Sequence, residues 1–449
     1  MKKLFGFALV LLVASLFYSC KDTPPVSAPV SDNNTSGTLN KVSYPQADFF
    51  LVQYTANESD FTNAVNDAGG SVDAIHPEIK VAKVSGLTDK TAAQLEKKGG
   101  IKSVSRDLMV QWVNPDANVI EQSIGSDESF WGYQWAPQAI HAPEAWDAGF
   151  TGQGIRVAVI DGGIASNHID LRDNIDVAAS RSFVPGFNFN EDTGTFWHAT
   201  HVAGIIAAED NGIGTIGIAP HATIIGVKAL HNGSGSFSAI ISAILYAAND
   251  AHADIINMSL GAVFPRNSND AAKLIVALGK AVNYAYQKGV TVIVAAGNDA
   301  IDFDHAYMYV SEPAEIQHVI CVSATGPTGF AYGGTNFDDP AEYTNYGQSL
   351  ISFAAPGGND LLYPNGNWYY DMILSPSFGT VSYTWADGTS MAAPNVAGVV
   401  ALIMQSHGGH LSPSRVEAIL RSSSDDLGKP GNDDYYGQGR VNAYNAVMQ

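Results

Sequence analysis

Three separated segments carry side chains that can perform acid–base and nucleophilic chemistry. Asp161 ends the apolar run VAVID, His198 opens HATHVAGIIAA, and Ser390 stands ahead of the apolar stretch MAAPNVAGVVALIM. Taken alone, the aspartate is interpreted as the cap of a loop, the histidine as a core or capping residue, and the serine as a helix N-cap. Taken together, a carboxylate can orient an imidazole, and a neutral imidazole can accept the proton of a serine hydroxyl.

A metal site is the alternative for the second segment, because His198 and His201 lie three residues apart. Histidines at this spacing can ligate one ion. However, no third ligand follows at a recognisable spacing, the sequence contains no H-E-x-x-H pattern, and small residues surround the pair. Metal ligation is therefore the weaker interpretation, beside a core or capping role.

Composition limits the classes of protein to consider. The chain has 449 residues, of which 46% are hydrophobic and 15% charged, so it can bury a sizeable core. Its formal net charge of −21 repels phosphate backbones and argues against a nucleic-acid partner. Two cysteines, Cys20 and Cys321, cannot build a disulfide framework or a cysteine-rich zinc site. Cys321 lies in the apolar run HVICVSAT and is predicted to be a core residue of a strand.

The elements that must position these side chains follow an α/β pattern. Strands are expected at 155–160, 223–230, 253–260, 289–297, 318–325 and 350–356, and helices at 200–209, 236–250, 270–288 and 391–406. Strands that are apolar on both faces and alternate with helices predict a mainly parallel sheet covered on both sides. Such sheets carry their sites beyond the carboxyl ends of the strands, which is where Asp161 falls.

The N-terminal end has the features of an export signal. Residues 1–20 combine two lysines, an apolar stretch too short to span a bilayer comfortably, and a terminal Ser19–Cys20. This end resembles a bacterial lipobox, in which Cys20 would carry the lipid, although Tyr18 is bulkier than usual and plain secretion stays an alternative. Residues 21–43 are rich in proline, serine and asparagine and are predicted to be a disordered tether.

Two folded regions follow the tether. Residues 44–113 are expected to form a small α+β domain, with strands at 49–55, 79–86 and 101–107 and helices at 61–68 and 88–97. Thr88 is the expected N-cap of the second helix. Residues 114–134 are polar and are expected to be a weakly structured, cleavable linker, and residues 135–449 form the main domain.

The order Asp161, His198, Ser390, with the blocks H-A-T-H-V-A-G and G-T-S-M-A-A-P, resembles the signature of the subtilisin-like serine proteases, the subtilases. The resemblance covers nearly all of residues 135–449. It implies a subtilisin-like three-layer α/β domain and an endopeptidase with these three residues as its triad. By the same resemblance, Asn298 in VAAGND is an oxyanion donor beside the backbone N–H of Ser390, and the 44–113 domain is a propeptide that inhibits the enzyme.

The resemblance also implies a substrate groove. Two extended segments would pair with the substrate backbone, namely Gly233, Ser234 and Gly235 on one side and Ser259, Leu260 and Gly261 on the other. Ala295, Ala296 and Gly297 would form a wall of the primary specificity pocket. Ser311 and Glu312 would line its base, where an acid favours basic side chains unless Glu312 points to solvent, so no specificity is predicted.

A structural calcium ion is expected by resemblance in the loop EDNGIGTIG, and no organic cofactor is expected. Its ligands would be the side chains of Asp170 and Asn211 and the backbone carbonyls near Glu209, Ile213 and Thr215, all oxygen donors that suit a hard cation. Asp170 and Asn211 as ordinary turn residues are the alternative.

Three positions depart from the family pattern. Gly162 follows Asp161 where serine or threonine is common, Ala199 replaces the glycine after His198, and Asn395 stands where histidine is usual. None removes a reacting group, so altered rate or substrate choice is expected. A long aromatic stretch, residues 357–386, separates the AAPG loop from the serine block.

Two functions remain to be compared. The first is a monomeric endopeptidase made as a zymogen, exported and tethered by lipid or secreted, that acts on protein or peptide substrates. The second is a binding or adhesive surface lipoprotein that keeps the fold without turnover. A hydrolase of the nucleophile-elbow type is set aside, because no serine lies in G-x-S-x-G and the order of the three residues differs.

Overall fold

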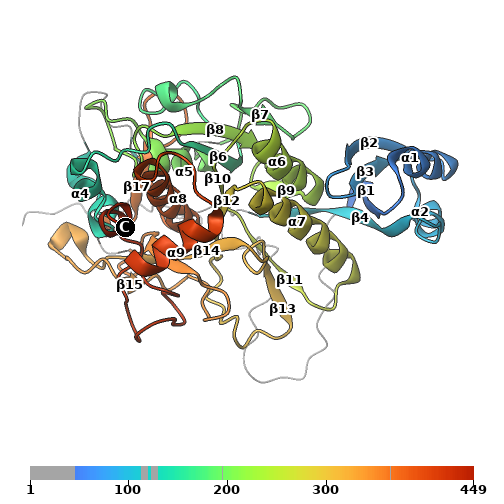
Figure 1. Cartoon of the computed structure of the whole chain (residues 1–449). Coiled ribbons are helices and arrows are strands. Elements are labelled where there is room, and N and C mark those ends of the chain that lie inside the picture. Colours follow the sequence, from blue (N-terminus) through green and yellow to red (C-terminus); the bar gives the residue numbers. More distant parts are fainter. Residues whose placement is uncertain (1–45, 113–119, 123–129, 195, 365) are drawn as a thin grey trace, which may run out of the picture.

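The structure is a computed structural model that describes residues 46–112, 120–122, 130–194, 196–364 and 366–449. The signal segment with Cys20, the tether and most of the 114–134 linker lie outside the described residues. A small N-terminal domain stands to one side of a large α/β domain, and strand β4 joins the two (Figure 1). Among the helices that the structure describes, none is long and apolar enough to cross a membrane.

The N-terminal domain is an antiparallel sheet in the order β2-β3-β1-β4, with two helices. Its elements are β1 (Gln46–Tyr54), α1 (Glu58–Asp67), β2 (Ser71–His76), β3 (Val81–Ser85), α2 (Asp89–Leu95) and β4 (Ile101–Gln111). The helices and the sheet share one small core, and Thr88 caps α2 by accepting a hydrogen bond from the Thr91 amide, as predicted. Strand β2 was not predicted from the sequence. All its residues are exposed or only partly buried, so the segment has no clear apolar face.

The main domain is built on a sheet in the order β15-β14-β12-β10-β6-β8-β7, with β16 beside β14. Its strands are β6 (Arg156–Asp161), β7 (Arg181–Ser182), β8 (Thr223–Lys228), β10 (Ile255–Met258), β12 (Thr291–Ala295), β14 (Val319–Gly326), β15 (Asp339–Pro340) and β16 (Phe353–Pro356). All these strands pair in parallel except β15. The six predicted strands and the parallel sheet are therefore confirmed.

Helices cover both faces of this sheet. The longer ones are α5 (His198–Ala207), α6 (Phe237–Asn249), α7 (Asn269–Gln287), α8 (Thr389–Ser406) and α9 (Pro413–Ser423). Alternate strand residues enter two cores, since Val157 and Val159 pack with α5 and α8, whereas Ala158 and Ile160 pack with α6 and α7. Cys321 is buried in the second core, as predicted, and burial raises the pKa of its thiol.

Two helix starts differ from the prediction. Helix α5 begins at His198 instead of 200, and α8 begins at Thr389 instead of 391. Neither has a side-chain cap, since the residues before them are Trp197 and Gly388. The sequence therefore lacks the usual start signal. Because α8 begins at Thr389, Ser390 lies inside the first turn of this helix.

The remaining elements are short. They comprise β5 (Ile120–Gln122), η1 (Trp131–Tyr133), α3 (Ala136–Ala139), α4 (Ala142–Asp147), η2 (Arg172–Asn174), β9 (Ser234–Ser236), β11 (Ala262–Pro265), β13 (Tyr309–Glu312), η3 (Phe330–Tyr332), η4 (Trp368–Asp371), β17 (Ile373–Pro376), β18 (Tyr383–Ala386) and α10 (Ala443–Val447). The aromatic stretch 357–386 supplies η4, β17 and β18. Strand β18 pairs with β5, so residues 120–122 of the predicted linker form a short strand.

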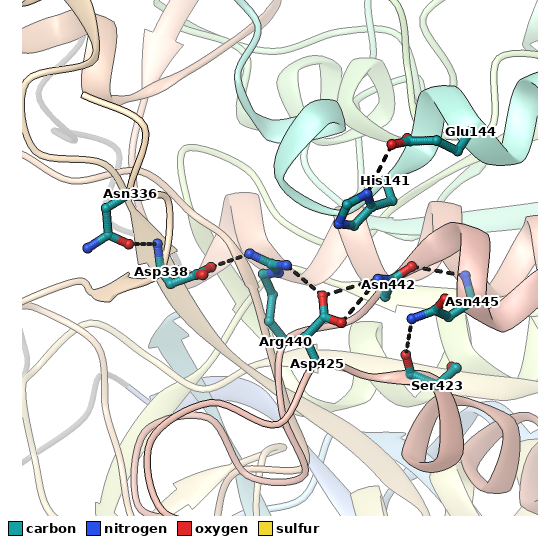
Figure 2. A network of polar contacts seen from close by, with 9 residues as sticks. All are labelled: His141, Glu144, Asn336, Asp338, Ser423, Asp425, Arg440, Asn442 and Asn445. Carbon is teal, nitrogen blue, oxygen red and sulfur yellow. Dashed lines mark hydrogen bonds and ion pairs between the residues drawn. The ribbon is translucent and has the colours of Figure 1, made fainter. Parts of the chain in front are cut away.

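A polar network fastens the C-terminal segment to the main domain (Figure 2). The Arg440 guanidinium is largely buried and bonds both Asp338 and Asp425, the latter at 2.6 Å. Asn442 Nδ2 donates to both oxygens of Asp425, each at 3.1 Å. One buried cation therefore holds two carboxylates from segments far apart in the sequence.

Replacing Arg440 by methionine is expected to lower the free energy of unfolding by about 2–3 kcal/mol. The loss of a buried partner leaves two carboxylates uncompensated, but both are partly exposed, so the effect falls short of a fully buried pair. Urea unfolding of the Ser390→Ala chain, which avoids self-digestion, measures it. Arg440→Lys keeps the charge without the two-pronged geometry and should lie between the two. An unchanged midpoint in Arg440→Met would contradict the assignment.

Candidate active site

Asp161 and His198 form a close pair at the carboxyl end of the central sheet. Asp161 is the last residue of β6, and its side chain is 2% exposed. His198 is the first residue of α5, and its Nδ1 lies 2.8 Å from Asp161 Oδ2. The other carboxylate oxygen accepts a hydrogen bond from the Gly162 amide at 2.6 Å. With the Nδ1 proton donated to Asp161, Nε2 is left as a base.

Ser390 is the second residue of α8 and contacts one wall of the predicted groove. Its hydroxyl donates to the carbonyl of Ser259 at 3.1 Å, and the Ser259 hydroxyl donates to the carbonyl of Ser390 at 2.7 Å. Within the described residues, no hydrogen bond joins Ser390 to His198. In proteases without bound substrate such a bond is often long and tightens only in the complex. Helices α5 and α8, whose first turns hold His198 and Ser390, pack against each other.

Asn298 lies three residues beyond the end of β12 and is held by the residue before Ser390. Its Oδ1 accepts from the Thr389 amide at 2.9 Å and from the Thr389 hydroxyl at 2.7 Å. Because Oδ1 is occupied, the amide group Nδ2 faces Gly388, 3.2 Å from the point where a Cβ would stand. Gly388 has φ 144, which favours glycine. The side-chain donor of Asn298 is thereby placed at the start of α8.

Thr389 and Tyr343 also lie at this site, although neither was predicted from the sequence to be a site residue. Thr389 fixes the orientation of Asn298, and its hydroxyl also accepts from the Gly297 amide at 3.0 Å. The buried Tyr343 hydroxyl accepts from the Gly388 amide and donates to the carbonyl of Gly358, each at 2.8 Å. Burial raises the pKa of Tyr343 well above its ordinary value. Thr389 stands in the G-T-S motif and was recognisable there, whereas nothing in the sequence singles out Tyr343.

The two segments predicted to form the groove bind the same stretch of the N-terminal domain. Met109 to Gln111 of β4 pair antiparallel with β9 (Ser234–Ser236). On the next residue, the Trp112 amide donates to the carbonyl of Gly233 at 3.1 Å, and the Gly261 amide donates to the carbonyl of Trp112 at 2.9 Å. The predicted walls therefore face each other across an extended peptide, and Leu260 of one wall is buried in the same hydrophobic core as Trp112.

Trp112 fills an apolar recess at this position. Its ring packs edge-on against Phe237 with centroids 5.0 Å apart and lies 5.8 Å from Phe264. The indole N–H donates to the carbonyl of Gly235 at 2.9 Å, and the residue is 3% exposed. The end of β4 is therefore anchored by its backbone and by one large side chain.

The predicted pocket wall and base lie behind these segments. Ala295 and Ala296 are buried at the end of β12, Gly297 follows with φ 99, and the Ser311 hydroxyl donates to the carbonyl of Ala296 at 3.3 Å. Glu312 is 4% exposed, so the alternative of a side chain pointing to solvent is wrong. Burial raises the pKa of Glu312 to about 8, and neighbouring Glu315 adds to the shift. Burial therefore favours the neutral form of this carboxyl group.

Ala199 and Asn395, two of the three positions that depart from the family pattern, have packing roles in the structure. The same is true of His201. Ala199 is buried, and Asn395 Nδ2 donates to the carbonyls of Pro356 and Met391. His201 is buried with Nε2 facing the carbonyls of Ile373 and Thr384, and burial lowers its pKa to about 3. His201 is thus a neutral core residue, and in the described chain no group of three or more His, Cys, Asp or Glu gathers to hold a metal.

The candidate calcium residues lie on two neighbouring segments, Asp170 on one and residues 209–215 on the other, beside β18. Asp170 Oδ2 accepts from the Thr215 amide and hydroxyl, while Asp170 Oδ1 is buried and has no hydrogen-bond partner among the residues that the structure describes. Asn211 Oδ1 accepts from the Ile213 amide, and Glu209 Oε2 accepts from Asn211 Nδ2. Oxygen donors from both segments fit a hard cation, although the Tyr383 hydroxyl also interacts with the Asp170 carboxyl group.

An aromatic side chain also occupies this region. The Tyr383 hydroxyl lies 1.9 Å from the point where a Cβ on Gly214 would stand, so only glycine fits that loop position. Burial raises the pKa of Asp170 to about 8, because the dry surroundings disfavour its charged form. Burial therefore disfavours the charged form of Asp170, and the Thr215 and Tyr383 hydrogen bonds offset that effect in part.

The chain is similar in sequence to a known protein family and to several of its members. Residues 152–439 match the family model "Subtilase family". Thermitase from Thermoactinomyces vulgaris is 35% identical over 329 residues, which is 72% of this chain and 99% of thermitase. The thermophilic serine proteinase of Bacillus sp. (strain AK1) is 29% identical over 94% of this chain and 92% of its own.

A solved structure shares the fold over most of the length. The epidermin leader peptide processing serine protease of Staphylococcus aureus superposes with a TM-score of 0.74 at 24% identity, covering 89% of this chain and 97% of that one. The predicted subtilisin-like three-layer fold is therefore confirmed. On its signature segments and on these relatives, the chain belongs to the subtilase family and is a serine endopeptidase.

Proposed function

We propose that Asp161, His198 and Ser390 form the catalytic triad that hydrolyses peptide bonds through an acyl-enzyme. The observation that carries this proposal is the 2.8 Å contact between His198 Nδ1 and the buried Asp161 carboxylate. It lies at the carboxyl end of the sheet, and Ser390 stands in the first turn of α8, which packs against the helix of His198. A buried carboxylate there stabilises the imidazolium that forms when His198 takes a proton.

The reaction follows from the groups at hand. His198 Nε2 accepts the Ser390 proton as Oγ attacks the scissile carbonyl carbon, and the carbonyl π electrons move onto oxygen. The Ser390 backbone N–H and the Asn298 side-chain amide donate hydrogen bonds to that oxyanion. Collapse breaks the C–N bond, and His198 protonates the leaving amine. Water, activated by His198 in the same way, then releases the acyl group and restores Ser390.

Residues 44–113 are proposed to be a propeptide that occupies the groove until it is cut. Its support is the backbone pairing of β4 with β9 and of Trp112 with Gly233 and Gly261. The Asp107 carboxylate also accepts from the Ser238 amide at the start of α6, which anchors the domain on the main one. The similarity to the Bacillus proteinase and to the Staphylococcus structure extends over this domain, since both cover about nine-tenths of the chain.

Trp112→Ala is expected to shorten the lag before the newly cut zymogen becomes active, by about tenfold or more. Removing a buried aromatic anchor from an interface costs about 2 kcal/mol or more of affinity. Continuous hydrolysis of a chromogenic peptide after dilution reports the lag. Lys90→Ala, on an exposed position of α2, is the matched change within the same domain and should leave the lag alone. Equal lags in both variants would rule out the anchor.

Export and lipid attachment at Cys20 remain predictions from the first 20 residues. The lipobox-like end and the polar tether favour an enzyme held at the cell envelope, with plain secretion as the alternative. Globomycin, which blocks lipoprotein signal peptidase, should make the precursor accumulate if Cys20 is lipidated, and Cys20→Ala should release the protein into the medium.

Calcium is proposed to bind at Asp170 with the carbonyls of the 209–215 loop, where it would supply structural charge compensation. Saturating calcium is expected to raise the free energy of unfolding by about 2.7 kcal/mol at a hundred times its dissociation constant. Thermal unfolding of Ser390→Ala with calcium or with chelator tests this. Asp170→Asn should erase the difference, whereas a calcium effect that survives in Asp170→Asn places the ion elsewhere.

The proposed activity is tested by the intact mass of residues 21–449 beside the Ser390→Ala variant. The parent should lose a fragment ending between Gln111 and Trp135, while the variant stays whole, because only a working nucleophile cuts its own linker. If both stay whole although folded, and a fluorophosphonate does not label Ser390 of the parent, the proposal fails and a binding protein without turnover becomes the better account.

A further inference from the structure

A buried lysine lies beside the Asp161–His198 pair, and the proposed reaction has no use for it. Lys228 ends β8, and its side chain is 0% exposed. Its ammonium nitrogen has no hydrogen-bond partner among the described residues. In the parallel pairing of β6 with β8, Lys228 stands directly opposite Asp161. Because a buried cation is costly unless it is compensated, its position calls for a physical reason.

A second carboxylate, Asp192, faces the same ammonium group. Asp192 Oδ1 lies 3.7 Å from Lys228 Nζ, and the Asp192 side chain is only 10% exposed. Backbone amides fix this carboxylate, since Gly163 donates to Oδ2 at 2.8 Å and Thr193 donates to Oδ1 at 3.0 Å. One cation therefore compensates two carboxylates that come from different segments.

The glycine after Asp161 is what admits Asp192. A Cβ placed on Gly162 would lie 2.5 Å from Asp192 Oδ2, closer than any real contact. A serine or threonine at this position would therefore displace the carboxylate. The glycine at position 162 and the carboxylate of Asp192 therefore depend on each other, because Asp192 takes up the space that a side chain at position 162 would need.

Other charges near Lys228 are directed elsewhere. Glu191 is exposed, and its carboxylate accepts from the backbone and side chain of Asn188. Arg181 on β7, the strand paired with β8, stacks over Phe183 and Tyr246. Burial lowers the pKa of Lys228, while Asp192 and Asp161 oppose that shift by favouring the charged form. Glu191 also favours the charged form of Lys228, but from an exposed side chain whose effect the solvent screens. The least exposed carboxylates near Lys228 are therefore Asp192 and Asp161, and Asp161 in turn contacts His198.

The structure assigns Lys228 and Asp192 as positioning residues that set how strongly Asp161 stabilises a protonated His198. This assignment rests on the proposed role of His198 as the base. The ammonium of Lys228 disfavours an imidazolium at His198, and the carboxylate of Asp192 favours it. Together they set the pH below which His198 is protonated and acylation of Ser390 stops.

The test is the pH profile of kcat/KM for a chromogenic peptide, measured on matured enzyme. Lys228→Met should move the acid limb to higher pH by about one unit, a tenfold loss of relative rate on that limb. Asp192→Asn should move it to lower pH by a similar amount, and the double variant should return close to the parent. Lys288→Met, a loss of one lysine away from the site, should leave the limb unchanged.

Opposite shifts separate this role from loss of packing, which has no reason to reverse sign between the two variants. Shifts in the same direction, or an unmoved limb in Asp192→Asn, overturn the assignment; Asp192→Asn also serves if Lys228→Met fails to fold. NMR titration of His198 in the Ser390→Ala chain gives a readout independent of turnover. Titration shifts without any hydrolysis by the parent would sink the proposed function alone, and hydrolysis with unmoved titration would sink this inference alone.

Discussion

Replacing His198 by alanine is expected to lower kcat for peptide hydrolysis by about six orders of magnitude. In subtilisin, which belongs to the same family, loss of either the serine or the histidine lowers kcat about 2 × 10⁶-fold, and removal of all three residues costs no more. We expect the same order here because His198 already contacts Asp161 at 2.8 Å and its other nitrogen is the base available to Ser390.

The experiment needs a mature form of an inactive enzyme. His198→Ala, Ser390→Ala and the double variant are therefore cut in trans with a trace of active protease, which is then inhibited by an agent that leaves the variants untouched. All three should show the same residual rate, since the two groups act as a unit. A His198→Ala enzyme within tenfold of the parent, or a double variant far slower than either single one, would disprove the triad.

Replacing Asn298 by leucine is expected to lower kcat by about 10²–10³-fold while KM changes little. A side-chain donor aimed at the oxyanion acts in the transition state and contributes that much in enzymes of this mechanism. The structure places the Asn298 amide beside Gly388 at the start of α8, with Oδ1 held by both the backbone and the hydroxyl of Thr389. Leucine keeps the volume and removes only the donor.

Thr389→Val is the matched change, because it removes one of the two bonds that hold Asn298 and leaves the donor in place. It should lower kcat by a smaller factor, and the double variant with Asn298→Leu should be no slower than Asn298→Leu alone. If Asn298→Leu raises KM instead of lowering kcat, the side chain binds the substrate and is no oxyanion donor.

The residues proposed for chemistry could be identified from the sequence because their signals are local. Asp161 at the end of an apolar strand, His198 and Ser390 at the starts of apolar helices, and Asn298 after a third strand all lie in short motifs. Alternation of apolar strands with helices predicted the parallel sheet for the same reason, since each element shows its own periodicity. The subtilase signature then linked those motifs.

What surrounds these residues was decided by contacts between distant segments. The bond from Thr389 to Asn298 spans 91 residues, and the bond from Trp112 to Gly235 spans 123. No local pattern encodes such a distance. Two further contacts between distant segments are the pairing of β5 with β18 and that of β13, which carries the buried Glu312, with β11.

Gly162 shows most clearly the difference between what the sequence predicts and what the tertiary structure decides. In the sequence it is a missing hydroxyl beside Asp161, for which an altered rate or substrate choice is expected. In the tertiary structure the space of its absent side chain is taken by Asp192, whose charge faces Lys228. The sequence by itself therefore determined the family, the fold class and the residues proposed to react. Only the tertiary structure decided their electrostatic surroundings and the occupant of the groove, because burial and charge depend on atoms that meet only after folding.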